Sequence, residues 1–267
     1  MVLKQIGFVQ TSPEFQNKEA NFREVEDLAK NVRADLLVLP ELFATGYTFA
    51  HPEETEALAE KLDGETAEFL RSIAETTSAV VCGGFIQKSE GEEKPYNACL
   101  LVNEKEVIGA YQKIHLFNKE NLWFTQGNKP FKVYNTANMK IGLMICFDWI
   151  FPEAARSLAL QGAEILAHPT NLVLPYCQDA MVSRCIENQV FGVTANRIGT
   201  ESNGEEKCTF TGASQITGTR GEILAKGEID NTSVVVQEID TELAHDKSLN
   251  PFNHVFNDRR PDLYHLK

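Results

Sequence analysis

The sequence has little positive charge. Its 267 residues carry 25 lysines and arginines against 38 aspartates and glutamates, a formal net charge of −13 at pH 7. A nucleic-acid-binding protein neutralises phosphates with a basic surface, and docking on an anionic membrane needs a similar cluster of lysine and arginine. We therefore expect neither a nucleic-acid partner nor a membrane partner.

Long apolar runs and paired cysteines are also missing. No stretch reaches the roughly 18 uninterrupted apolar residues of a membrane span, and the first residues lack the apolar core and cleavage site of a secretion signal. The six cysteines are scattered, with no CxxC pair. Such cysteines are usually free thiols in a reducing compartment, so we expect a cytoplasmic protein.

No proline- or serine-rich linker and no repeat divides the chain, so we expect one domain over residues 1–267. Strand-like apolar runs alternate with amphipathic helical stretches, which favours a layered α/β fold. Turns are expected at Asn203-Gly204 and at 217–221, where glycines tolerate positive φ. The expected helices are 20–32, 65–76, 153–160 and 176–189, and the expected strands include 4–10, 140–146 and 208–216.

Two charged residues interrupt apolar, strand-like sequence. Glu41 directly follows the apolar run that ends at Pro40, and Lys113 stands between apolar neighbours. A carboxylate at the end of a buried strand is partly desolvated, which raises its pKa toward a value useful for a general base. A buried lysine needs a carboxylate partner. Taken singly, Glu41 is better explained as a loop acid turned to water, and Lys113 as a side chain that reaches solvent.

Cys146 stands where a strand, a turn and a helix follow one another. The strand expected at 140–146 ends at this residue, and Pro152-Glu153 is typical of the first turn of a helix. A thiol at such a junction lies at a sheet edge, where backbone N–H groups of the turn can face a developing oxyanion. Buried cysteines are commonly inert, as we expect of Cys82, Cys99 and Cys208. The position of Cys146 favours a nucleophile instead.

These residues lie in motifs that occur together in one family. The sequence resembles the nitrilase superfamily of carbon–nitrogen hydrolases over nearly its whole length. Members carry a glutamate after a Leu-Pro strand end, a lysine in a Tyr-Arg-Lys-x-His-Leu strand, and a cysteine before an aspartate and a Phe-Pro-Glu. An arginine of that pattern is replaced by Gln112. The corresponding segments are Pro40-Glu41, Tyr111-Gln112-Lys113-Ile114-His115-Leu116, Cys146-Phe147-Asp148 and Phe151-Pro152-Glu153.

The resemblance implies a catalytic role for several of these residues. Cys146 would be the nucleophile, Glu41 the general base and Lys113 the stabiliser of the tetrahedral intermediate. Glu120 matches a second glutamate that orients the site, although a surface acid in a polar loop explains it equally well. The backbone N–H of Phe147 would be a further oxyanion donor.

The resemblance also implies a substrate pocket and no cofactor. Reaction through a thioester on the cysteine requires neither a metal nor an organic cofactor, and the six histidines show no HExxH or other metal-ligand spacing. Aromatic residues favour an apolar pocket, although such residues are more often core. The expected pocket residues are Tyr47, Phe117, Trp149 and Asn171, with Trp123 and Tyr176 as further candidates.

The residues around the nucleophile favour amide cleavage. True nitrilases typically show Cys-Trp-Glu there, whereas this chain has Cys146-Phe147-Asp148, a form that some nitrile-cleaving relatives share. The ω-amidase branch carries an arginine shortly after that aspartate, and Trp149-Ile150 stands there instead. We expect a small, moderately apolar carboxamide to be cleaved to a carboxylic acid and ammonia. The alternative substrate is a nitrile or an N-carbamoyl amino acid, and Arg184 would hold the carboxylate of the latter. The remote alternative is a non-catalytic interaction protein on the same fold.

The family fold implies the architecture and the assembly. It is an α/β, four-layer α-β-β-α sandwich with two mixed β-sheets. Members pair through an outer helical layer, here the helices expected at 153–160 and 176–189, with residues 249–267 as a C-terminal tail that crosses to the partner. We therefore expect a homodimer or a higher homo-oligomer.

Overall fold

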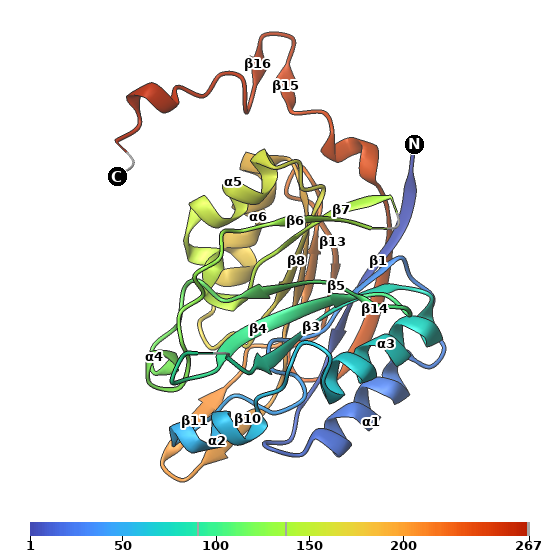
Figure 1. The fold of residues 1–267 in the computed structure, drawn as a ribbon. Helices are drawn as coiled ribbons and strands as arrows, with labels where there is room; N and C mark the ends of the chain where they lie inside the picture. Colours follow the sequence, from blue (N-terminus) through green and yellow to red (C-terminus); the bar gives the residue numbers. More distant parts are fainter. Residues whose placement is uncertain (90, 137, 266–267) are drawn as a thin grey trace.

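The computed structural model describes residues 1–89, 91–136 and 138–265. Within them, two six-stranded sheets lie face to face, and helices cover the outer face of each sheet (Figure 1). This arrangement is the α/β, four-layer sandwich with two mixed sheets that the family resemblance implies. In the same part of the chain, no helix is both long enough and apolar enough to cross a membrane.

The first sheet has the order β14-β1-β2-β3-β4-β5. The pairs β1–β2 and β2–β3 are parallel, and the other three pairs are antiparallel. The central strand β2 is short, and all of its residues are buried. The segment that follows β2 therefore begins inside the molecule. The strands are β1 (Leu3–Gln10), β2 (Leu36–Val38), β3 (Val80–Gln87), β4 (Tyr96–Val102), β5 (Val107–Gln112) and β14 (Ser233–Asp240).

The second sheet repeats the pattern with the order β13-β12-β9-β8-β7-β6. Its pairs β7–β8 and β8–β9 are parallel and its outer pairs are antiparallel. The carboxyl ends of β7 and β8 therefore lie at the same edge. The strands are β6 (Val133–Thr136), β7 (Met139–Leu143), β8 (Ile165–Pro169), β9 (Phe191–Ala195), β12 (Gln215–Thr217) and β13 (Ile223–Lys226).

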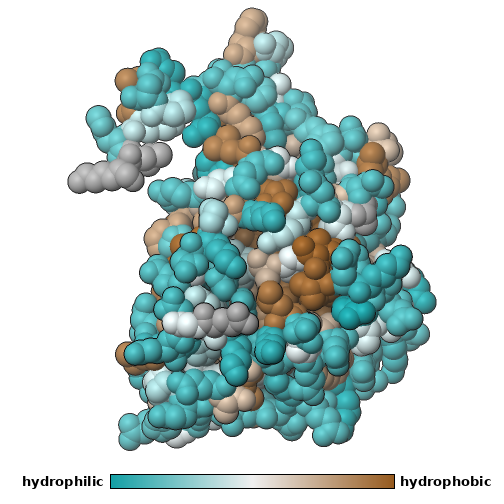
Figure 2. Space-filling model, viewed as in Figure 1, coloured by the Kyte–Doolittle hydropathy of each residue, from teal (hydrophilic) through white to brown (hydrophobic). Residues whose placement is uncertain are grey.

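The core has two parts, and alternate side chains of a buried strand belong to different parts. Ile6 and Phe8 of β1 pack in the cluster that holds Ile141 and Ile165 of the second sheet, whereas Val9 packs in the cluster with the helices on the outer face. Successive residues of a strand point to opposite faces, so a continuous apolar run can serve both layers. Figure 2 shows a mainly hydrophilic surface, with apolar side chains gathered where the edge strands β5 and β6 lie in Figure 1.

The outer helices correspond to the amphipathic segments. On the first sheet, α3 buries Ala67, Leu70, Ile73 and Ala74, the i, i+3, i+4 spacing of one helix face. On the second sheet, α5 begins with Pro152 at its first turn, as predicted. Most of the acidic residues between positions 53 and 75 lie in α2 or α3. The helices are α1 (Lys18–Ala29), α2 (Pro52–Leu58), α3 (Glu65–Thr77), α4 (Glu120–Trp123), α5 (Pro152–Leu160) and α6 (Cys177–Asn188).

One predicted strand is wrong. The segment 208–216 is split between two sheets, because β11 (Glu206–Thr209) pairs with β10 (Thr200–Asn203) in a separate hairpin. Gly212 and Ala213 have φ values of 56° and 52°, which a strand cannot accommodate, and they turn the chain toward β12. The turn predicted at Asn203-Gly204 is confirmed as the tip of this hairpin, with Gly204 at a φ of 59°.

The C-terminal segment leaves the two sheets. After the 3₁₀ helix Thr241–Ala244, the chain forms a small hairpin, β15 (Ser248–Asn250) and β16 (Asn253–His254), and a last 3₁₀ turn at Pro261–Leu263. In Figure 1 this segment arches past the ends of α5 and α6 and away from the body. Phe252 is 91% exposed, whereas Phe256 is partly buried and packs against the core between the sheets.

Candidate active site

Glu41 is held inside the molecule by a close backbone approach. It follows β2, and the N–H of Gly84 on the neighbouring β3 donates to the carbonyl of Pro40 at 3.1 Å. A Cβ at position 84 would lie 2.6 Å from the Cα of Glu41, closer than real Cβ contacts. Glycine therefore lets the β3 backbone lie against the Glu41 backbone, and Glu41 is fully buried.

Lys113 joins two buried carboxylates that lie beyond the strands of the first sheet. Its Nζ lies 2.6 Å from Oε1 of Glu41 and 2.8 Å from Oε1 of Glu120, and all three side chains are at most 3% exposed. Lys113 follows the edge strand β5, and Glu120 begins α4 seven residues later. The structure thus brings together three of the four residues expected to be catalytic.

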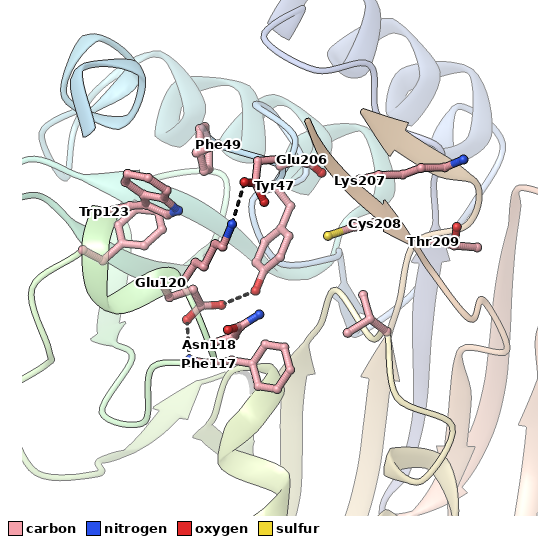
Figure 3. A pocket seen from close by; sticks show the side chains of 14 residues that line it. Tyr47, Phe49, Phe117, Asn118, Glu120, Trp123, Glu206, Lys207, Cys208 and Thr209 are labelled. Carbon is pink, nitrogen blue, oxygen red and sulfur yellow. Dashed lines mark hydrogen bonds and ion pairs between the residues drawn. The ribbon is translucent and has the colours of Figure 1, made fainter. Parts of the chain in front are cut away.

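Uncharged donors complete this cluster. Asn97 of β4 donates its Nδ2–H to Oε1 of Glu41 at 2.7 Å. The hydroxyl of Tyr47 donates to Oε1 of Glu120 at 2.7 Å, and the backbone N–H of Phe117 donates to its Oε2 at 3.0 Å (Figure 3). Both Glu120 oxygens are therefore occupied, which fixes the position of this carboxylate.

The electrostatics of the cluster set the protonation states. Burial raises the pKa of Glu41, although Lys113 opposes the rise. Burial acts to lower the pKa of Lys113, but the charges of Glu120 and Glu41 outweigh it and raise that pKa. Lys113 is therefore a permanent cation, and Glu41 is a carboxylate with more affinity for a proton than an exposed glutamate.

Cys146 lies at the carboxyl end of β7, in a strained turn. Its φ is +39°, unusual for a residue other than glycine, and it begins the 3₁₀ helix Cys146–Ile150 that leads into α5. Burial and then the charge of Glu41 raise the pKa of the Cys146 thiol, and the charge of Lys113 and a backbone hydrogen bond from Asn171 lower it in part. Cys146 is 5% exposed, and its thiol stays protonated until a base removes the proton.

Two buried side chains hold the cysteine turn. Oδ2 of Asp148 accepts from the N–H of Ile145 and from the hydroxyl of Tyr111, both at 2.8 Å. Nε2 of His168 lies 2.9 Å from the carbonyl oxygen of Cys146, and burial lowers the pKa of His168 to about 4. A neutral imidazole with Nε2–H donates to that carbonyl, so His168 stabilises the turn rather than removing protons.

Two polar groups near the thiol have no partner among the described residues. Oε2 of Glu41 is buried without a hydrogen bond, and so are both polar atoms of the Asn171 carboxamide. Buried polar groups in native proteins are nearly always paired. Glu41 Oε2 is thus the free acceptor of the cluster, and Asn171 offers both a donor and an acceptor to a bound molecule.

A cavity of about 370 Å³ opens beside Glu120. A narrower cleft at Cys146 shares two of its walls, Phe117 and Val173. Figure 3 shows Tyr47, Glu120 and Phe117 on one side of the cavity and the hairpin residues of β11 on another. The cavity is lined by Tyr47, Thr48, Phe49, Phe117, Asn118, Lys119, Glu120, Trp123, Phe124, Val173, Glu206, Lys207, Cys208 and Thr209, and the cleft by Phe117, Cys146, Phe147, Trp149, Asn171, Leu172, Val173 and Leu174.

Most predicted pocket residues line these two spaces, but two candidates do not. Tyr176 is 62% exposed and lines neither. Arg184 lies on α6, where it donates to the carbonyl of Trp149 and pairs with Glu187 at 3.2 Å. Arg184 therefore supports the 3₁₀ helix after Cys146 and is not placed to hold a substrate carboxylate. Cys208, expected to be an inert core thiol, is half-buried in the cavity wall.

The comparisons with known proteins agree with this arrangement. The sequence profile of the carbon-nitrogen hydrolase family matches residues 5–246, so the chain belongs to that family. It is 41% identical to a protein named nitrilase from Pyrococcus abyssi, over 97% of this chain and 98% of that one. It is 32% identical to an N-carbamoylputrescine amidase of Arabidopsis thaliana, over 86% of this chain and 83% of that one.

Solved structures show the same fold. A carbon-nitrogen hydrolase from Helicobacter pylori G27 superposes with a TM-score of 0.89 at 26% identity, covering 98% of this chain and 97% of that one. A mutant amidase from Nesterenkonia sp. AN1, in which acrylamide has added to the active-site cysteine, superposes with a TM-score of 0.75 at 25% identity, over 91% and 96% of the two chains. This chain is a carbon–nitrogen hydrolase, and both amidase and nitrilase activity fit its relatives.

The described residues contain no group of three or more His, Cys, Asp and Glu side chains that could hold a metal ion. Among the ionisable groups of the site, Glu41 and Glu120 are joined by their contacts with Lys113.

Replacing Lys113 should destabilise the protein in a pH-dependent way. Lys113→Met leaves two buried carboxylates without their cation, which typically costs about 3–5 kcal/mol. The loss raises the folded-state pKa of Glu41 further above the ordinary glutamate value of about 4.3, so the variant binds protons on folding. The penalty is therefore full at neutral pH and shrinks as the pH falls through the raised pKa.

Urea unfolding between pH 4.5 and 7.5 measures this effect, with the exposed Lys105→Met as the matched control. A penalty that is constant across this range would contradict the burial of both charges beside Lys113.

Proposed function

We propose that this protein hydrolyses a small carboxamide to a carboxylic acid and ammonia, with Cys146 as nucleophile, Glu41 as general base and Lys113 as electrostatic stabiliser. The observation that carries the proposal is the unpaired Oε2 of Glu41, on a carboxylate whose other oxygen binds Lys113. A buried carboxylate oxygen without a donor is suited to accept the proton of a thiol whose pKa it raises.

In the first step the thiol attacks the amide carbon. Because burial keeps the Cys146 thiol protonated, sulfur becomes nucleophilic as its proton moves to Glu41. The C–S bond forms, and the carbonyl π electrons move to oxygen. The product is a tetrahedral intermediate with a negative oxygen.

That oxygen needs nearby positive charge. Lys113 remains protonated, and we assign it to this role together with the backbone N–H of Phe147. Loss of one such donor typically costs about 3–4 kcal/mol of transition-state stabilisation. Glu120 holds the Lys113 ammonium from its other side at 2.8 Å, so its role is to position the lysine.

The intermediate then collapses. Glu41 returns the proton to the amide nitrogen, the C–N bond breaks, and ammonia leaves a thioester on Cys146. Glu41 next takes a proton from water, whose oxygen attacks the thioester carbon. The C–S bond breaks, the carboxylic acid is released, and the thiol regains its proton.

Nitrile hydrolysis is the second candidate. The protein named nitrilase that is 41% identical to this chain favours it, whereas the Cys146-Phe147-Asp148 motif favours amides. N-carbamoyl substrates are supported by the relatives named N-carbamoylputrescine amidase, but Arg184 is paired away from the site. The same thiol and base would serve each of these substrates.

Cys146→Ala should abolish ammonia release from a panel of short amides, nitriles and N-carbamoyl amino acids. The thioester cannot form without the sulfur, and the unmutated protein should show an acyl mass adduct on the peptide that contains Cys146. Cys177→Ala, a buried cysteine on α6, is the control and should retain turnover. Ammonia release by the Cys146→Ala protein would contradict the mechanism, and no release from any compound by the unmutated protein would favour a binding role.

We further propose that the chain forms a homodimer in a reducing compartment. The six cysteines are all free, which supports the compartment. Apolar side chains are exposed on the layer of α5 and α6, including Leu160 at 45% and Ile186 at 44%. The C-terminal tail adds Phe252 at 91% exposure and Leu263 at 60%. Burial of such side chains against a second copy would be favourable.

A mass measurement in solution tests this assembly. We expect twice the chain mass of 29.8 kDa, and a lower dimer affinity when residues 249–267 are removed. A single-chain mass at micromolar concentration would contradict the dimer.

A further inference from the structure

The cavity beside Glu120 has walls of two kinds. Phe49, Trp123 and Phe124 form an aromatic wall, and the β10–β11 hairpin contributes Glu206 to Thr209 on the other side (Figure 3). Because the cavity shares Phe117 and Val173 with the cleft at Cys146, the part of a substrate beyond the reacting carbonyl would extend into it. The charges of the cavity lining therefore decide which acyl chains bind.

Four charged side chains line the cavity, and three are accounted for. Glu120 is bound by Lys113, Tyr47 and the Phe117 N–H. Lys119, on the loop before α4, pairs with Glu206 of the hairpin, with Nζ and Oε1 2.6 Å apart. The ion pair joins two segments that are 87 residues apart in sequence.

Lys207 is the fourth charged group, and it points elsewhere. Figure 3 shows its side chain extending away from Tyr47 and Glu120, with its nitrogen at the far end. Arg184, the arginine predicted to bind a carboxylate, is paired with Glu187. Within the described residues, Lys119 is thus the lining cation best placed to meet the end of a substrate, and Glu206 already neutralises it.

We propose that Glu206 is a specificity-determining residue that restricts the site to amides with an uncharged acyl chain. A distal carboxylate would have to leave water for an aromatic-walled cavity and compete with Glu206 for Lys119, which is unfavourable. Removing the charge of Glu206 leaves Lys119 available for a charge-assisted hydrogen bond to that carboxylate. This inference rests on the proposed amide hydrolysis, and it specifies uncharged acyl chains as the class that the site accepts.

The ion pair contributes little to folding, which makes it suitable for mutation. The Lys119 and Glu206 side chains are 51% and 30% exposed, and pairs of this kind stabilise proteins only weakly. Glu206→Gln should therefore fold normally. Glu205→Gln is the matched control, since Glu205 is exposed, lies beside Glu206 in the same hairpin and is outside the cavity lining.

The experiment compares pentanamide with glutaramate, which have the same chain length but end in a methyl group and a carboxylate. The unmutated protein should prefer pentanamide. In Glu206→Gln, the ratio of kcat/KM for glutaramate to that for pentanamide should rise by about tenfold or more, the usual effect of a hydrogen bond to a charged group. Lys119→Met/Glu206→Gln should lose that gain, and Glu205→Gln should show none.

Each outcome bears on one claim. If no protein in the series releases ammonia from either amide or from the wider panel, the proposed function fails. If pentanamide is hydrolysed but Glu206→Gln leaves the ratio unchanged, or Glu205→Gln raises it equally, the role of Glu206 is wrong. Equal use of both amides by the unmutated protein would also overturn it.

Discussion

The site depends on one buried cation held between two carboxylates. Lys113 contacts Glu41 at 2.6 Å and Glu120 at 2.8 Å, where water is excluded. Burial opposes the ionised form of Glu41 and the protonated form of Lys113, and the contact between the two groups offsets both effects. The cluster thereby keeps a carboxylate and a positive charge side by side, and the packing around it holds both in place.

The fold supplies that packing through its strand ends. Glu41 follows β2, Lys113 follows β5, Cys146 lies beyond the end of β7, and His168 lies on β8. The two mixed sheets bring these points together at the interior, although they come from distant parts of the sequence. Backbone features that carry no charge are as necessary as the side chains, above all the close approach of Gly84 to Glu41 and the positive φ of Cys146.

The sequence predicts the candidate catalytic residues better than the side chains that support them. Glu41, Lys113 and Cys146 stand in local motifs that occur together in one family, although Glu41 and Lys113 taken singly have commoner explanations. Asn97 acts through a partner 56 residues away, and no local pattern marks it. The segment 208–216 reads as one strand because its apolar residues alternate, while the break at Gly212 and Ala213 is a backbone property that alternation does not reveal.

The pH dependence of Cys146 alkylation by iodoacetamide, in the unmutated protein and in Glu41→Gln, tests the central claim most directly. The charge of Glu41 raises the pKa of the thiol, so if electrostatics alone governed reactivity, Glu41→Gln would react faster. A general base typically contributes about 10²–10⁴-fold. We predict slower alkylation of Glu41→Gln than of the unmutated protein at pH 7. In the unmutated protein the alkylation rate should fall on acidification with an apparent pKa above that of an ordinary glutamate. Equal or faster alkylation of Glu41→Gln would contradict the account.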